Sequence, residues 1–371
     1  PATAPEAFRE AMSAAVEERL DADRALIPLS GGLDSTSIAA AAAKACRSGR
    51  ARSKLKAYTG LRSGDDVEAQ FARSVASRLQ LSHELFMPER DSLLATPMPS
   101  WYPVTQFFAN GGGERSRRLY ADADVVLYGS AGDSVLHPER ATLLGIMRSH
   151  GLRHAIHAWR TLRSQGRSLS LGTGLGGGRQ ASEALTVTRA DKAPSLPAWL
   201  DRGFVAECRL QERLEETLRW RPPDALHPVH PNAQFLLQWA NWFWGFFPVG
   251  TRFTPPEWTD PFLDFRVLSV VFALPAEPWL HGKHLVRQAG RDELPVEVLS
   301  RPKTPAGNYV ASWIEALDRT VLDGWQMSPE LACFVDRGAV PPIDMSVEGS
   351  NSYLNFRPMM LQRWYSCLQD W

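Results

Sequence analysis

Short apolar runs alternate with helix-like stretches through the first 140 residues. One helical stripe in residues 5–20 holds the apolar positions Phe8, Met12, Val16 and Leu20. The apolar runs that follow predict strands at residues 25–29, 54–59, 83–86 and 124–129. The stretches between these runs predict helices at residues 37–45, 66–80 and 114–121. Strands that alternate with helices indicate an α/β protein whose parallel sheet is covered by helices on both faces.

The strand signals end near residue 140, and the pattern beyond it is mainly helical. Helices are expected at residues 141–162, 203–219, 232–247, 264–274, 283–290, 308–324 and 352–369. We therefore expect two parts, an α/β core over residues 1–140 and a helical part over residues 141–371. Residues 163–195 are rich in Gly, Ser and Arg and include the run GTGLGGG. Because no apolar strand precedes that run, it predicts a flexible surface loop rather than a nucleotide-binding loop.

The stretch LSGGLDS joins the first predicted strand to an alanine-rich helix. A helix N-terminus presents unpaired N–H groups and the positive end of a dipole, so it binds anions. Gly31 and Gly32 allow close backbone approach to a ligand, and Ser30 and Ser35 can add hydroxyl donors. Asp34 would repel a phosphate unless Mg²⁺ lay between them. The pattern favours a phosphate-binding loop over a plain helix N-cap with a glycine turn, and its spacing excludes the common P-loop.

A second glycine turn, GSAGDS at residues 129–134, follows the fourth predicted strand. Ligands of open parallel sheets lie beyond the carboxyl ends of the strands. Both loops come directly after a strand, so we expect them to face one crevice.

Charge and composition narrow the class of protein. The chain has 371 residues, with 41 Lys+Arg and 41 Asp+Glu, so its formal net charge is zero. This balance argues against a general binder of nucleic acid or anionic membranes. The most apolar stretch, residues 235–249, is too short to span a bilayer comfortably, and a buried helix is expected. Four widely spaced cysteines have no metal-binding spacing, and no signal peptide is visible, so we expect a cytoplasmic protein with reduced thiols.

Several stretches together resemble one family. They are the LSGGLDS loop, GSAGD at residues 129–133, DPFLDFRVL at 260–268, and HGKHLVRQAGRDELPVEVLSRPKTPAG at 281–307. They resemble the synthetase domain of class B asparagine synthetases and its relatives, the β-lactam synthetases and lasso-peptide cyclases, over residues 5–369. This resemblance implies a parallel sheet of the ATP pyrophosphatase (adenine nucleotide alpha-hydrolase-like) type. The first loop is then the pyrophosphate loop of that group.

The resemblance also implies that the chain binds ATP and Mg²⁺. The residues that match the pyrophosphate cradle are Ser30, Gly31, Gly32 and Ser35. Asp34 and Asp133 match the two Mg²⁺ carboxylates, and Asp34 also belongs to the nucleotide-binding loop. Backbone groups of Leu29, Tyr58 and Gly129 match positions that hold the adenosine.

Three basic residues of the C-terminal part match family positions near phosphate. Lys303 matches the lysine that stabilises the adenylate and the departing phosphates, where a flexible ammonium suits charge that moves during reaction. Lys283 is expected to contact phosphate, and Arg301 to assist. The alternatives are a solvated loop lysine for Lys303 and a surface salt bridge for Arg301. For Asp133 the alternative is an aspartate that caps the turn after a strand.

The loop at residues 129–134 departs from the family pattern. Asparagine synthetases have Gly-Glu-Gly-x-Asp-Glu here, and β-lactam synthetases place a Tyr where the first Glu stands. This chain has Ser130 at that catalytic position, and a serine hydroxyl is a poor general base without a partner. Glu257 matches a family glutamate that pairs with that base, and we expect it to contribute to proton transfer. His137 is a second candidate, although a lone His is more often structural.

The reaction implied by the resemblance has two steps. A substrate carboxylate attacks the α-phosphorus of ATP to give an acyl-adenylate and pyrophosphate, and a nitrogen nucleophile then displaces AMP. The segments RPKTP at residues 301–305 and LPAWLD at 196–201 resemble those of lasso-peptide cyclases. We therefore expect an AMP-forming ligase that closes the macrolactam ring of a lasso peptide. The bond would join the N-terminal amine of a precursor peptide to its Asp or Glu side chain.

By the same resemblance, a leader peptidase and a leader-binding protein are expected partners. The glutamine-hydrolysing domain of asparagine synthetases, with its N-terminal Cys nucleophile, is not supplied by this chain, so we expect any such domain on a separate or removed piece. One alternative function is a small-molecule amide synthetase, acting on aspartate or a β-amino acid. Another is a non-catalytic scaffold of the same fold, suggested by Ser130 and Ser134. A tRNA-modifying enzyme is disfavoured by the balanced charge.

Overall fold

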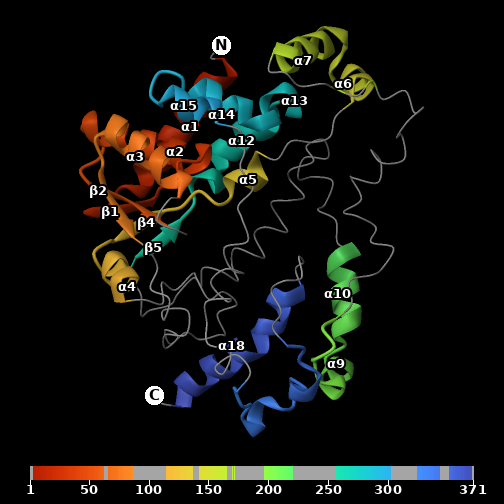
Figure 1. Ribbon diagram of the computed structural model, residues 1–371. Helices are drawn as coiled ribbons and strands as arrows, with labels where there is room; N and C mark the ends of the chain where they lie inside the picture. Colours follow the sequence, from red (N-terminus) through yellow and green to blue (C-terminus); the bar gives the residue numbers. More distant parts are fainter. Residues whose placement is uncertain are drawn as a thin grey trace.

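A five-stranded parallel sheet combines four strands from the N-terminal half with one from residues 257–259 (Figure 1). The computed structural model describes residues 3–61, 66–86, 114–136, 142–164, 169, 171, 196–219, 256–301, 324–342 and 351–369. The strand order is β3-β2-β1-β4-β5, with bounds β1 Arg24–Pro28, β2 Lys54–Gly60, β3 Ser82–Phe86, β4 Val125–Leu127 and β5 Glu257–Thr259. All four neighbouring pairs are parallel. The predicted fold class is confirmed, and β5 is the strand that the pattern did not predict.

Helices cover both faces of this sheet. Alternate strand residues such as Ala25 and Ile27 face the main core, which α1 (Ala4–Arg19), α2 (Leu33–Arg47) and α3 (Val67–Leu79) complete. The intervening residues, such as Leu26 and Val126, face a smaller core with Leu119 of α4 (Glu114–Ala121). Figure 1 shows α1, α2 and α3 above the sheet and α4 below it. The period-two pattern of the strands therefore decides which residues meet which helix layer.

Residues 256–301 return to the sheet after a long excursion of the chain. They contain β5, η3 (Pro261–Leu263), α12 (Phe265–Ala273), α13 (Ala276–Trp279), η4 (His281–Lys283), α14 (His284–Ala289) and α15 (Val296–Ser300). Phe262, Val267 and Leu285 of this segment are fully buried in the same core as Phe8 of α1. The main hydrophobic core thus joins residues on both sides of the expected boundary at residue 140. The division into two parts stays a prediction.

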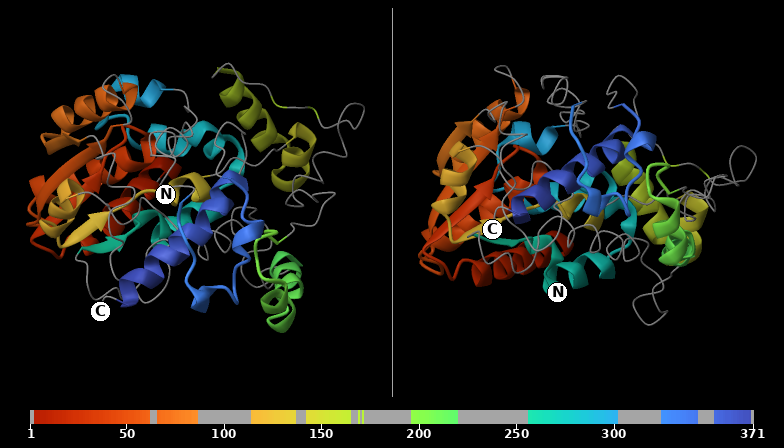
Figure 2. Two further views of the ribbon diagram at one scale, coloured as in Figure 1. Left: turned by 60° about the horizontal axis from the view of Figure 1, so that its bottom comes forward. Right: turned by 90° about the horizontal axis from the view of Figure 1, so that it is seen from below.

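The remaining described elements are helical, and all except α5 lie away from the sheet (Figure 2). They are α5 (Gly132–Val135) shortly after β4, α6 (Leu143–His150), α7 (Leu152–Ser164), α9 (Arg202–Glu207), α10 (Leu210–Arg219), η5 (Pro329–Leu331), η6 (Arg337–Ala339) and α18 (Asn351–Gln369). The LPAWLD segment pairs with residues 334–336, where the Leu200 and Val335 backbones form an antiparallel bridge. The expected helices at 232–247 and 308–324, and the run GTGLGGG, lie outside the described residues.

No helix within the described part of the chain is long and apolar enough to cross a membrane.

Candidate functional site

The loop after β1 is closed by hydrogen bonds between its own residues. The backbone N–H of Ser30 donates to the Ser35 hydroxyl at 3.2 Å, and the two serine hydroxyls lie 3.1 Å apart. The Ser35 hydroxyl also donates to the Gly32 carbonyl at 3.3 Å. The Leu29 N–H donates to the Tyr58 carbonyl at 2.8 Å, which extends the β1–β2 pairing to the start of the loop. The seven-residue motif therefore builds its own turn at the N-terminus of α2.

Gly31 is the residue that allows this turn to pack beneath α3. Its φ of +67° is in the left-handed region that favours glycine. A Cβ at this position would lie 2.5 Å from Phe71 Cβ and 2.8 Å from the Ala72 backbone nitrogen. Both the conformation and the space exclude any side chain here, and the close neighbour is helix α3; the approach of a ligand to Gly31 stays a prediction.

The loop after β4 packs directly against the first loop. A Cβ on Gly132 would lie 2.5 Å from Asp34 Cγ, and one on Gly129 would lie 3.4 Å from the Ser35 nitrogen. The Tyr128 N–H donates to the Thr259 carbonyl at 2.8 Å, so β5 supports the start of this loop. The expectation that both glycine turns come together at the carboxyl ends of the strands thus agrees with the geometry.

Lys283 joins the two loops through their aspartates. Its ammonium forms ion pairs with the carboxylates of Asp34 and, at 2.7 Å, of Asp133. The Lys283 side chain is only 15 % exposed, whereas Asp133 is 55 % exposed. Burial lowers the pKa of Lys283, but the two carboxylates outweigh it and hold the pKa above its ordinary value. Asp34, Asp133 and Lys283, all singled out from the sequence, therefore meet in one charged cluster. The cluster joins both loops to a segment that lies about 150 residues further along the chain.

The donor chemistry of this cluster suits a magnesium ion shared with a substrate. Two carboxylates that reach one cation supply hard oxygen ligands, and Mg²⁺ is usually bound by one or two carboxylates together with substrate phosphates. Within the described residues, no group of three or more His, Cys, Asp or Glu could hold a metal alone. The site therefore fits a metal that arrives with phosphate oxygens rather than a closed protein cage.

Ser130 and Glu257 are not brought together. The Ser130 hydroxyl oxygen is buried and has no hydrogen-bond partner among the described residues. Glu257 is exposed at the start of β5, paired with Val125 at the start of β4. Because β5 runs parallel to β4, its first residue lies at the amino end of the sheet, while the loop that carries Ser130 follows the carboxyl end. Besides Lys283, Asp260 reaches this loop from the segment after β5.

Asp260 is a buried acid that the sequence pattern did not single out. It is 3 % exposed and accepts hydrogen bonds from the Ala131 N–H at 2.7 Å and the Phe262 N–H at 3.0 Å. Burial raises the pKa of Asp260 to about 7, the negative charge of Asp34 adds to the rise, and the two N–H donors and Arg19 oppose it. A polar residue immediately before the apolar Pro-Phe-Leu run was the signal that could have drawn attention to it.

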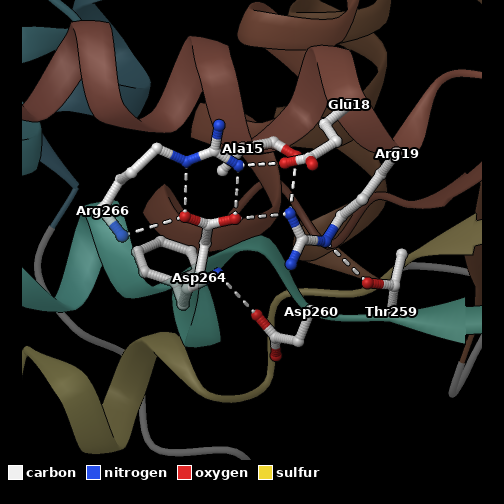
Figure 3. A network of polar contacts seen from close by, with 8 residues as sticks. Ala15, Glu18, Arg19, Thr259, Asp260, Asp264 and Arg266 are labelled. Atoms are coloured by element: carbon white, nitrogen blue, oxygen red, sulfur yellow. Dashed lines mark hydrogen bonds and ion pairs between the residues drawn. The ribbon is translucent and has the colours of Figure 1, made fainter.

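Asp264, four residues later, serves a different purpose (Figure 3). Its carboxylate receives hydrogen bonds from the guanidinium groups of Arg19, at 2.8 Å, and Arg266. The Arg266 and Arg19 donors hold the pKa of Asp264 well below its usual range, although burial opposes them. Arg19 also donates to Thr259 Oγ1 at 2.7 Å, and Arg266 pairs with Glu18. This network fastens the segment after β5 to helix α1.

Two other predicted residues lie beside the first loop. Arg301 is nearly buried, with its guanidinium 3.4 Å from the Gly31 carbonyl oxygen, 4.5 Å above the Phe71 ring and 3.6 Å from Glu68. It therefore supports the loop rather than forming only a surface salt bridge. Tyr58 is buried, and its hydroxyl lies 3.1 Å from that of Tyr120. Lys303 and His137 lie outside the described residues.

The parallel sheet, its covering helices and the glycine turn at the N-terminus of α2 define an α/β fold of the ATP pyrophosphatase type. A family model for asparagine synthase matches residues 7–243 and 257–366. The chain therefore belongs to the asparagine synthase family, and this membership supports an ATP-dependent, amide-forming ligase in general. A comparison with individually curated proteins gave no match.

Proposed function

We propose that this protein activates a carboxylate as an acyl-adenylate and passes it to an amine, with AMP and pyrophosphate as the other products. The observation that carries the proposal is the meeting of Asp34, Asp133 and Lys283 where the two loops touch. Ser30, Gly31, Gly32 and Ser35 would cradle the pyrophosphate. Backbone groups at Leu29, Tyr58 and Gly129 would hold the adenosine.

Asp34 and Asp133 would hold Mg²⁺, which when bound neutralises phosphate charge and polarises the α-phosphorus for attack. Lys283 would exchange its carboxylate partners for phosphate oxygens, because its ammonium lies between both loops. Lys303 would stabilise the adenylate. The Ser130 hydroxyl would need a partner to transfer a proton, and Glu257, the partner expected from the sequence, lies at the opposite end of β5.

The more specific proposal is a lasso-peptide cyclase, supported by the RPKTP and LPAWLD segments. The substrate would be a precursor peptide freed of its leader, and the nucleophile would be its own N-terminal amine. A leader peptidase, a leader-binding protein and, where one exists, a separate N-terminal domain would be partners, with no nucleic acid or membrane involved.

The test is nucleotide analysis with parallel mass spectrometry of the protein mixed with ATP and Mg²⁺. Formation of AMP with loss of one water from a leaderless peptide that bears an internal Asp or Glu supports the cyclase. AMP formed only with aspartate plus ammonia assigns the protein to small-molecule amide synthesis. If no acid yields AMP even with the expected partners added, a scaffold without catalysis is the better reading.

Two variants and one control sharpen this test. Asp34→Asn and Lys283→Met should each reduce AMP formation at least about a hundredfold, since each removes a charge from the site. Lys44→Met is the matched control, because Lys44 also pairs with a carboxylate of the C-terminal segment, Glu293 at 2.8 Å, but lies near the far end of α2. Full activity of Asp34→Asn would contradict the proposed metal role.

A further inference from the structure

Asp260 contacts the loop after β4 from 129 residues further along the chain. It is not among the residues matched to ATP or Mg²⁺. Its neighbours Pro261 and Phe262 are buried and apolar, and a buried carboxylate is costly unless donors satisfy it. Both of its oxygens have such donors, and both donors are backbone N–H groups. Because both carboxylate oxygens accept backbone hydrogen bonds, we infer that Asp260 has a specific structural task.

The hydrogen bonds of Ala131 indicate what this task is. The Ala131 carbonyl accepts hydrogen bonds from the N–H groups of Ser134 at 2.9 Å and Val135 at 2.8 Å, which start helix α5. Its own N–H is held by Asp260. Both polar groups of this residue are therefore fixed, one within the loop and one from the C-terminal segment. Asp133, two residues further on, is carried by the same turn and pairs with Lys283 at 2.7 Å.

The loop has little room to move without disturbing the other half of the site. A Cβ on Gly132 would lie only 2.5 Å from Asp34 Cγ, so the Gly132 backbone is in close contact with the Asp34 side chain. Any displacement of Ala131 would shift Ser130 and Asp133 and would change the space left for Asp34. The hydrogen bond from Ala131 to Asp260 therefore holds the backbone that carries Asp133 and that packs against Asp34.

We propose that Asp260 is a positioning residue for this site. By accepting the Ala131 N–H, it holds the loop after β4 so that Asp133 and Ser130 keep fixed positions relative to Asp34 and Lys283. It makes the site sensitive to the docking of the segment after β5, since that segment supplies the acceptor. The proposal rests on the proposed function for what the site binds, but its geometric part can be tested without any nucleotide.

The first test is hydrogen exchange in the full chain without ligand, followed by mass spectrometry of peptides covering residues 129–136. Asp260→Val keeps the approximate volume and removes both acceptors, so exchange in this stretch should become about tenfold faster or more. Asp260→Asn retains one acceptor oxygen and should give a smaller increase. Asp264→Asn is the matched control, because Asp264 lies in the same segment and anchors α1 instead. It should leave residues 129–136 unchanged.

Unchanged exchange of residues 129–136 in Asp260→Val would overturn the proposal, and so would an equal increase in Asp264→Asn. If Asp260→Val does not fold, the comparison of Asp260→Asn with Asp264→Asn decides by the same criteria.

The second test measures binding of Mg·ATP by calorimetry together with the urea midpoint of each variant. Asp260→Val should weaken Mg·ATP binding about tenfold, with Asp260→Asn between it and the wild type, while Asp264→Asn loses stability without losing affinity. If affinity instead follows stability across all three variants, Asp260 is merely structural and the proposal fails. If the wild-type protein itself does not bind Mg·ATP, the proposed function fails, and the exchange result still decides the role of Asp260.

Discussion

The two loops that meet at Lys283 are held in different ways. The loop after β1 is closed mainly by its own residues, through the contacts among Ser30, Gly32 and Ser35, although Arg301 and Lys283 also reach it. The loop after β4 is held from outside, by Asp260 on its backbone and by Lys283 on its aspartate. The first loop can form together with its strand and helix. The second is complete only after residues 256–301 have docked onto the sheet.

Because of this difference, we expect the site to be most sensitive to changes in residues 256–301. The network of Arg19, Asp264 and Arg266 fastens that segment to α1, and β5 pairs with β4. Loss of the Asp260 acceptor, which this segment supplies, should therefore disturb the second loop before the first. Substitutions at the glycine or serine positions of the first loop should alter that loop only. The predictions below test this contrast, beginning with the largest effect.

Gly31→Ala should destabilise the protein by about 4 kcal/mol. The new Cβ would have to adopt a positive φ and would lie 2.5 Å from Phe71 Cβ and 2.8 Å from a backbone nitrogen. Urea unfolding measures the loss. Gly49→Ala is the control, since its φ is +74° but nothing lies within 4 Å of the added carbon. It should cost only about 1 kcal/mol. Similar losses in both variants would show that strain rather than contact with α3 makes Gly31 necessary.

Asp260, which holds the second loop, should give the protein an unusual dependence of stability on pH. The pKa of Asp260 is about 7 in the folded protein and 3.8 ordinarily, so between these values the folded state keeps a proton that the unfolded state has lost. Stability from this group therefore falls as pH rises from about 4 to about 7, by as much as about 4 kcal/mol. Asp34 and Arg19 are the charged side chains that act on this group, the first raising and the second lowering the pKa of Asp260.

Urea midpoints of the wild-type protein and Asp260→Asn, measured at several pH values across that range, should be closest at low pH, where the protonated carboxyl and the amide are both neutral. The wild-type midpoint should fall relative to that of the variant as pH rises. The difference between the two proteins removes the contribution of other titrating groups, including the histidines. A constant difference at every pH would mean that Asp260 titrates at its ordinary value.

Gly132→Ala in the second loop should weaken Mg·ATP binding more than it lowers the stability of the fold. The added carbon would lie 2.5 Å from Asp34 Cγ and 2.8 Å from its Oδ1, so the Asp34 side chain can shift at a cost of about 2 kcal/mol. That shift would disturb the pairing with Lys283. Calorimetry should show Mg·ATP binding at least about tenfold weaker, a larger effect than the modest loss in urea midpoint suggests. Unchanged binding would mean that Asp34 does not need its present position.

The contrast between the loops also explains what could be predicted from the sequence. The first loop is local, so LSGGLDS between an apolar strand and a helix was enough to indicate Gly31, Asp34 and the two serines. The alternating pattern likewise predicted four of the five strands. The second loop depends on partners far away in the chain, and no spacing rule links Asp260 to Ala131. Periodicity also could not reveal β5, which has three residues, nor which end of it Glu257 occupies.

Ser35→Ala should give the smallest effect, because a neighbouring contact remains in the loop. It removes the acceptor of the Ser30 N–H and the donor to the Gly32 carbonyl, a loss of about 1 kcal/mol in urea unfolding. Mg·ATP binding, followed by calorimetry, should weaken about fivefold because a hydroxyl of the cradle is lost. Ser37→Ala is the control one turn into α2, since its hydroxyl only donates back to the Asp34 carbonyl at 2.8 Å. If Ser37→Ala weakened binding as much as Ser35→Ala, the first loop would depend on helix α2 as a whole and not on its own hydroxyls, and its contrast with the second loop would disappear.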